Sequence, residues 1–72
     1  MAALTNFNYS TNYAEFSIDS AEEIELLPTT TAGGSGVLAN VGAVAAGSAA
    51  YTTDGNLDVY TLDGSGVWNK VE

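Results

Sequence analysis

The chain is short, acidic and lacks the side chains on which most enzymes depend. It has 72 residues, with nine Asp and Glu, one Lys, no Arg, no His and no Cys, and its formal net charge is −8. The lack of Cys excludes disulfides, and the lack of both Cys and His excludes an ordinary zinc site. A core of this size supplies only about 3–5 kcal/mol of stability. We therefore expect other chains to stabilise the fold, in a homo-oligomer or in a larger assembly.

Charge and composition also limit the partners and the chemistry. Nucleic-acid binding requires Lys and Arg to neutralise phosphates, and Lys70 is the only cationic side chain, so we expect no nucleic-acid partner. The longest charge-free apolar stretch, residues 37–50, is too short and too rich in Ala and Gly to span a bilayer, so we expect no membrane partner. Without an imidazole or a thiol, we expect no enzyme, no metal and no cofactor.

Residues 1–14 contain no charged side chain and are rich in Asn, Ser, Thr and aromatic residues. They show neither the period of two typical of a strand nor the period of 3.6 typical of a helix. Two interpretations are open. The segment is a disordered terminus, or it is an arm whose aromatic side chains, Phe7, Tyr9 and Tyr13, bind in pockets of a neighbouring chain. If it is an arm, the rest of the chain folds without it.

Residues 15–27 are strongly acidic and combine two local patterns. Phe16 and Ile18 alternate with polar residues as in a short strand. Ser20, followed three residues later by a glutamate, is typical of a helix start with a capping box. Pro28 follows almost at once, and the residue before a proline is pushed towards extended geometry. We therefore predict at most one helical turn, followed by extended chain.

The middle of the chain is a linker followed by an apolar segment. Residues 29–36 are rich in Thr and Gly, which is typical of a loop. Residues 37–46 consist of Val, Ala and other small residues, and their three valines and Gly42 favour an extended strand over a helix. We therefore divide the chain into an N-terminal arm with an acidic lead-in, residues 1–31, and a small β module, residues 32–72.

The last 25 residues carry the clearest structural signal. Three β-prone runs, residues 48–52, 57–62 and 67–71, are separated by turns that contain Asp-Gly, at residues 53–56 and 63–66. Asp-Gly between alternating runs is a strong hairpin signal, because Gly adopts the positive φ that the turn requires. The pattern predicts a three-stranded antiparallel meander.

The alternation in these runs also predicts which side chains share a face. It places four on one side: Ala50, Tyr60, Leu62 and Trp68. Asp58 and Lys70 fall at similar positions on their strands. Since so few strands cannot shield a face alone, we expect the meander to pack on residues 37–46 or on a second subunit. The expected fold class is all-β, a small antiparallel meander or sandwich with an extended N-terminal arm.

Two motifs in this region have a functional and a structural interpretation. Residues 54–58 have the alternating oxygen ligands of a calcium loop, but Val59 and Ser65 stand where an EF-hand needs Gly and Glu. A hairpin turn flanked by solvated acids explains the motif better. Tyr60 and Trp68 could together stack a sugar, although packing in a core or an interface is the commoner role of such a pair.

The second half of the chain resembles a short C-terminal module of tailed-bacteriophage virion proteins. The shared features are Gly-Ser-Ala-Ala-Tyr at residues 47–51, Val-Tyr at residues 59–60, and Gly-Val-Trp with a following Val within residues 66–71. Proteins with this module include head decoration, cement and head-fibre proteins and some tail components. The resemblance extends over residues 26–72 and implies a structural virion protein present in many copies.

The resemblance further implies that the chain binds the major capsid protein or another virion protein at the capsid surface and stabilises the head. It implies a β module that self-associates, for instance as a trimer. The candidate interface residues are Phe7, Tyr9, Tyr13, Phe16, Tyr60 and Trp68. Two other functions stay open, namely a receptor- or carbohydrate-binding module that uses Tyr51, Tyr60 and Trp68, and an adaptor or tail-fibre component.

Overall fold

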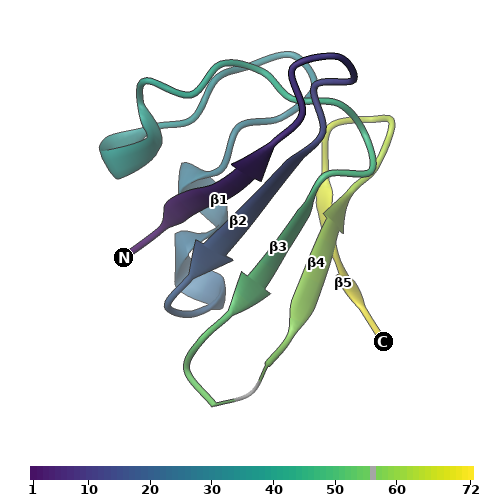
Figure 1. The fold of residues 1–72 in the computed structure, drawn as a ribbon. Helices are drawn as coiled ribbons and strands as arrows, with labels where there is room; N and C mark the ends of the chain where they lie inside the picture. The colour runs from purple at the N-terminus through teal and green to yellow at the C-terminus, as the bar shows by residue number, and fades with distance from the viewer. Residues whose placement is uncertain (56) are drawn as a thin grey trace.

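The computed structural model describes residues 1–55 and 57–72, and its strands form a single sheet (Figure 1). The strands are β1 (Ala3–Phe7), β2 (Ala14–Ile18), β3 (Ala49–Thr52), β4 (Val59–Leu62) and β5 (Trp68–Val71). Their order in the sheet is β1-β2-β3-β4-β5, the same as in the chain. The helical segments of the described residues are two short 3₁₀ helices, η1 (Ala21–Leu26) and η2 (Gly36–Leu38). The predicted all-β fold class is confirmed.

The pairing of the strands divides the sheet into a hairpin and a meander. β1 pairs antiparallel with β2, while β3, β4 and β5 pair antiparallel in succession, which confirms the predicted meander. The first predicted turn of the meander includes Asn56, which lies outside the described residues. β2 pairs with β3 in parallel. Parallel neighbours need a long crossover, and residues 19–48, which contain η1 and η2, supply it.

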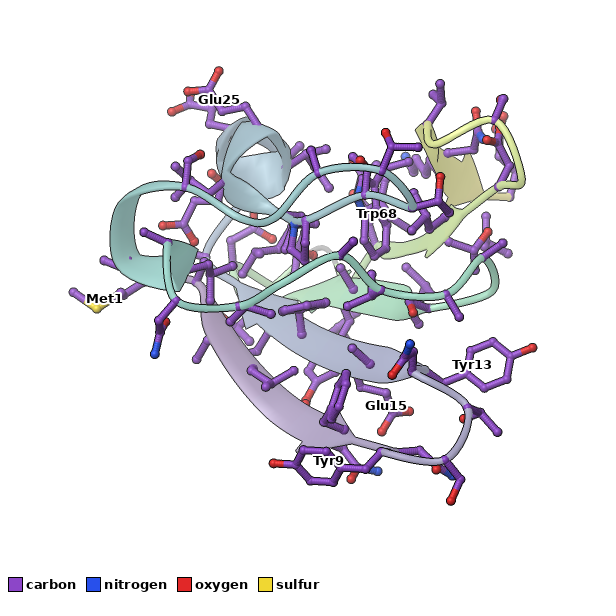
Figure 2. All side chains as sticks on the ribbon, turned by 90° about the horizontal axis from the view of Figure 1, so that it is seen from above. Met1, Tyr9, Tyr13, Glu15, Glu25 and Trp68 are labelled. Carbon is purple, nitrogen blue, oxygen red and sulfur yellow. The ribbon has the colours of Figure 1, made fainter. Side chains whose placement is uncertain are left out.

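This crossover covers one face of the sheet. In Figure 2, η1 and the crossover loops lie on one side of the strands, and Glu15 points from β2 to the other side. The core lies between the sheet and the crossover, and its buried side chains are Ala2, Ala14, Phe16, Ile18, Leu27, Leu38, Val44, Ala50 and Leu62. The structure is therefore one sheet under an irregular layer, and the alternative of a two-sheet sandwich is wrong.

The inner face of the meander matches its prediction. Ala50 and Leu62 are buried, and Tyr60 and Trp68 pack against the core from the same face. Lys70 Nζ lies 3.5 Å from Asp58 Oδ1, as their similar strand positions indicated.

The predicted arm over residues 1–14 is wrong, and residues 1–18 belong to the sheet. They form β1 and β2, and β2 occupies an interior position in the sheet, between β1 and β3. Ala14, Phe16 and Ile18 are all buried on the face that the crossover covers. With this face buried, β2 pairs with β1 on one side and with β3 on the other. The predicted boundary between residues 31 and 32 therefore does not separate two parts of the fold.

The predicted strand over residues 37–46 is also wrong. The segment begins within η2 and continues without regular structure. Leu38 and Val44 are buried in the core. The Val44 amide donates to the Thr29 carbonyl at 3.0 Å, within the crossover itself. Because the segment crosses the sheet, its apolar residues fill separate places in the core and its backbone gains no partner strand.

A short helix after Ser20 is present as η1, but its six residues make about two 3₁₀ turns, so the predicted limit of one turn is wrong. Ser20 is the extended residue before it but makes no capping hydrogen bond through its side chain. Glu23 still reaches back, because its Oε1 accepts a hydrogen bond from the Asp19 amide at 2.7 Å. Leu27 is extended, with ψ of 145°, as expected for the residue before Pro28.

Asp63 holds the turn between β4 and β5. Its Oδ1 accepts hydrogen bonds from the Ser65 amide at 2.9 Å, the Ser65 hydroxyl at 2.7 Å and the Val67 amide at 3.0 Å. Its Oδ2 accepts from Asn69 Nδ2 at 2.7 Å. Gly55 of the first Asp-Gly pair has the predicted positive φ, 99°, whereas in this turn the positive φ, 86°, belongs to Gly66 and not to Gly64 of the Asp-Gly pair. The carboxylate thus fixes the register of the last two strands.

The hydrogen bonds of Asp63 make the stability of the fold depend on pH in the acidic range. Hydrogen bonds from Val67, Ser65 and Asn69 lower the pKa of Asp63 from 3.8 to about 2. Because the pKa is lower in the folded chain, the carboxylate stabilises the fold above about pH 4 and loses this effect as the pH falls towards about 2. We expect Asp63→Ala to lower the thermal midpoint at neutral pH, with a difference from wild type that shrinks in this range. Thermal melts followed by circular dichroism at several pH values measure this difference in midpoint.

Glu22→Ala, which removes an exposed carboxylate of η1, is the control for the loss of one negative charge. A midpoint difference for Asp63→Ala that stays constant from neutral pH down to about pH 2 would contradict the role of the charged form.

Candidate interaction surface

The sheet face opposite the crossover carries no other element of the described chain, and we call it the open face. Its side chains form two rows across the five strands. One row consists of the directly paired residues Ala3, Ser17, Tyr51, Val59 and Val71. The other consists of Asn6, Glu15, Ala49, Thr61 and Asn69. We call these the apolar row and the polar row.

The open face differs in character from the rest of this acidic chain. Tyr51, Val59 and Val71 are neighbours in the apolar row, and 39%, 40% and 51% of their respective surfaces are exposed. Glu15 is the only charged side chain in either row. Interface cores are poor in charge and rich in aromatic residues, whereas free surfaces rarely gather large apolar side chains in contact. The open face therefore has the composition of a protein-binding surface.

A polar hollow of about 370 Å³ lies at one end of the open face, where the β1–β2 turn meets the start of β3. Its polar side chains come from Asn6, Asn8, Tyr13, Glu15 and Ser48. Figure 2 shows Tyr13 and Glu15 at the same end of β2. Gly47 also lines the hollow, and a Cβ on it would lie 2.8 Å from Tyr13 Cε1. Only a glycine lets the tyrosine ring lie this close to the backbone.

Hydrogen bonds fix three of these side chains. Asn6 Nδ2 donates to Glu15 Oε1 at 3.3 Å, which places the amide beside the carboxylate. Asn8 Oδ1 accepts from the amides of Ser10 and Thr11, at 2.9 and 3.3 Å, and so closes the β1–β2 turn. The hollow is therefore held by the hairpin and is built before any ligand arrives.

A second groove, of about 300 Å³, lies between β1 and the crossover loop at residues 40–43. Leu4 and Phe7 of β1 and Tyr9 of the following turn form one side of it. The rings of Phe7 and Tyr9 meet edge to face, with centroids 4.8 Å apart and an interplanar angle of 81°. No charged residue lines this groove.

The predicted interface residues fall into two groups. Phe16 is completely buried, and Tyr60 and Trp68 pack against the core. Trp68 meets Phe16 edge to face, with centroids 6.1 Å apart, and its Nε1 donates to the Pro28 carbonyl at 3.0 Å. Trp68 thus ties the crossover to the sheet, Phe16 offers no surface to a partner, and Tyr60 and Trp68 are only partly exposed.

The other predicted residues lie at the surface of the β1–β2 hairpin. Tyr9 is 88% exposed and Tyr13 is 49% exposed, while Phe7 is half-buried beside Tyr9. Tyr13 belongs to the polar hollow, and Phe7 and Tyr9 belong to the groove. The structure thus places these three aromatic residues at two separate sites.

Sequence reasoning missed the apolar row. Val59 and Val71 alternate along their strands with the residues that face the core, such as Tyr60 and Trp68. The alternation of the sequence therefore does indicate that both valines point to the other face. The continuation of the row onto β2 has no local signal, because the pairing of Ser17 with Tyr51 depends on the parallel contact of β2 and β3.

The described residues hold no group of three or more acidic side chains placed to bind a metal ion. In the same part of the chain, no helix is both long and apolar enough to cross a bilayer. Comparison of the chain with protein-family models, with curated proteins and with solved structures finds no significant match.

Proposed function

We propose that the chain is a structural virion protein that binds the major capsid protein or another virion protein at the capsid surface and reinforces the head. The observation that carries this proposal is the open face, with its row of exposed apolar side chains. The resemblance of residues 26–72 to virion modules supplies the context. The chain acts as a decoration or cement protein.

The size of the chain supports a role in a larger assembly. A stable protein contact buries roughly 800 Å² on each partner, and the whole accessible surface of this chain is 4153 Å². Docking through the open face therefore engages a large share of the molecule. Because a partner that binds only the folded state stabilises that state, the contact compensates for the small core.

Self-association is part of the proposal. Copies with a net charge of −8 repel each other, so contacts between them are least opposed at surfaces without charge. The uncharged groove beside β1 is such a surface.

A charge on the open face should prevent docking. We expect Val59→Glu to lower occupancy of the particle by on the order of tenfold or more, because an interface would desolvate an unpaired carboxylate. Occupancy is measured by sedimenting particles with the added protein, and circular dichroism checks that the variant is folded. Val37→Glu is the matched control, since Val37 is 49% exposed and lies on η2, away from the open face. Equal occupancy for the two variants would overturn the proposal.

The geometry gives no support to a carbohydrate platform made of Tyr51, Tyr60 and Trp68. Tyr51 projects from the open face, whereas Tyr60 and Trp68 pack on the covered face. An adaptor or tail-fibre role would use the same open face at another place on the particle. Imaging of labelled particles, which locates the protein on the head or on the tail, separates these roles.

A further inference from the structure

We propose that the polar hollow at the end of the open face binds an arginine side chain of the partner protein. This inference rests on the proposed function, in which the open face docks on another protein. It adds the chemistry by which the partner is recognised.

The groups that line the hollow suit a guanidinium. Glu15 supplies a carboxylate, with which arginine forms paired hydrogen bonds in a fixed planar geometry. Asn6 uses its Nδ2 on Glu15 Oε1, so its carbonyl oxygen is left as a further acceptor. Tyr13, which is half-exposed at the same hollow, offers a ring on which a guanidinium stacks.

The small residues of the hollow provide the room that this ligand needs. Gly47 and Ala49 line it beside Tyr13, and a side chain at Gly47 would collide with the tyrosine ring. The volume of about 370 Å³ is sufficient for a guanidinium together with part of its methylene chain. The stem can lie along Gly47 and Ala49 while the charged group meets Glu15.

Electrostatics selects a cation and excludes an anion. The chain has a net charge of −8, and Glu15 is the charged group of both the hollow and the open face. The field of the protein therefore attracts a positive group and repels phosphate or carboxylate. Arginine is favoured over lysine because several acceptors and a ring converge here, while an ammonium is a compact point charge with a stronger hydration shell.

The arginine must come from a different protein. This chain contains no Arg, and its single Lys, Lys70, is paired with Asp58 at 3.5 Å. By its register, Lys70 lies opposite Tyr60, on the face of the sheet away from the hollow. A second copy of the chain therefore has no arginine to insert.

Titration of the full chain with blocked amino acids tests the site. The probes are N-acetyl-arginine amide, N-acetyl-lysine amide and the neutral isostere N-acetyl-citrulline amide, followed by two-dimensional NMR. We expect the arginine compound to shift the amide signals of Asn6, Tyr13 and Glu15, with weaker shifts from the lysine compound and none from citrulline. Glu15→Gln should weaken arginine binding by roughly two- to fivefold, as removal of an exposed ion pair does.

Glu25→Gln is the matched control, because Glu25 is an exposed carboxylate of η1 and Figure 2 shows it on the opposite side of the molecule from Glu15. Citrulline binding as tight as arginine binding, shifts outside the hollow, or equal weakening by the two glutamine variants would overturn the inference.

The two proposals fail in different ways. If the arginine compound does not bind while particles take up the wild-type chain, the hollow is not an arginine site and the proposed function stands. If the compound binds at the hollow while particles take up no protein, the site stands and the virion function is overturned.

Discussion

Phe16→Ala is expected to unfold the isolated chain. Phe16 is completely buried on β2, between β1 and β3, and contacts Trp68 edge to face. Replacing a buried Phe by Ala costs about 3–5 kcal/mol, and a core of this size supplies only about 3–5 kcal/mol in total. The substitution therefore removes most or all of the free energy of unfolding. Urea titration followed by circular dichroism measures it.

Two variants bracket this result. Phe16→Leu keeps most of the apolar volume, and we expect it to cost less than about 1.5 kcal/mol. Tyr9→Ala removes an aromatic ring that is 88% exposed, and we expect a change within about 0.5 kcal/mol. A Phe16→Ala chain that unfolds cooperatively at the wild-type urea midpoint would show that Phe16 does not lie in the core.

Removal of residues 1–13 is expected to abolish the folded state as well. The deletion takes away β1, which is the antiparallel partner of β2. It also removes Ala2, which is buried in the core, and Phe7, which packs against it. The truncated chain would have an unprotected β2 edge and a core open on one side. A two-dimensional NMR spectrum with amide signals collapsed to the narrow range of an unfolded chain is the expected result.

The control is the full-length chain with Asn6→Ser and Tyr9→Ser, which keeps β1 and alters two exposed side chains. We expect its spectrum to stay dispersed. If the truncated chain instead gives the wild-type signals for β3, β4 and β5, residues 1–13 are a separable arm and the pairing of β1 with β2 has no part in stability.

The integration of the N-terminal hairpin affects how particle binding is tested. Truncation cannot separate loss of docking from loss of folding, because β1 and β2 belong to the sheet that presents the open face. Substitutions at exposed positions such as Val59 and Glu15 change the surface and leave the core intact. These variants are therefore the sharper tests of both proposals.

The meander could be predicted because its information is local. The turn at residues 63–66 contains its own determinants, with Asp63 as the hydrogen-bond acceptor and Gly66 at positive φ. Each run beside a turn alternates, so the shared face of Ala50 and Leu62 follows once neighbouring strands pair. Antiparallel hairpins bring together residues that are close in sequence, and short patterns are sufficient to identify them.

The N-terminal half could not be predicted in the same way. Phe16 and Ile18 had a visible strand pattern, but their neighbour on one side is β3, which follows only after the long crossover. No local pattern reports a parallel contact over such a distance, because it depends on which distant segment buries the same face. The strand predicted over residues 37–46 is wrong for the related reason that this apolar run fills the core without joining the sheet.

The sequence by itself determined the negative charge, the lack of imidazole, thiol and guanidinium groups, and the turns of the meander. These properties depend on residue identity and on near neighbours along the chain. Only the tertiary structure decided that the crossover covers one face, that Tyr51, Val59 and Val71 line the other, and that Asn6, Tyr13 and Glu15 meet Gly47 at its end. These arrangements arise because distant segments compete to bury apolar surface, and the face that the crossover leaves uncovered becomes the surface for a partner.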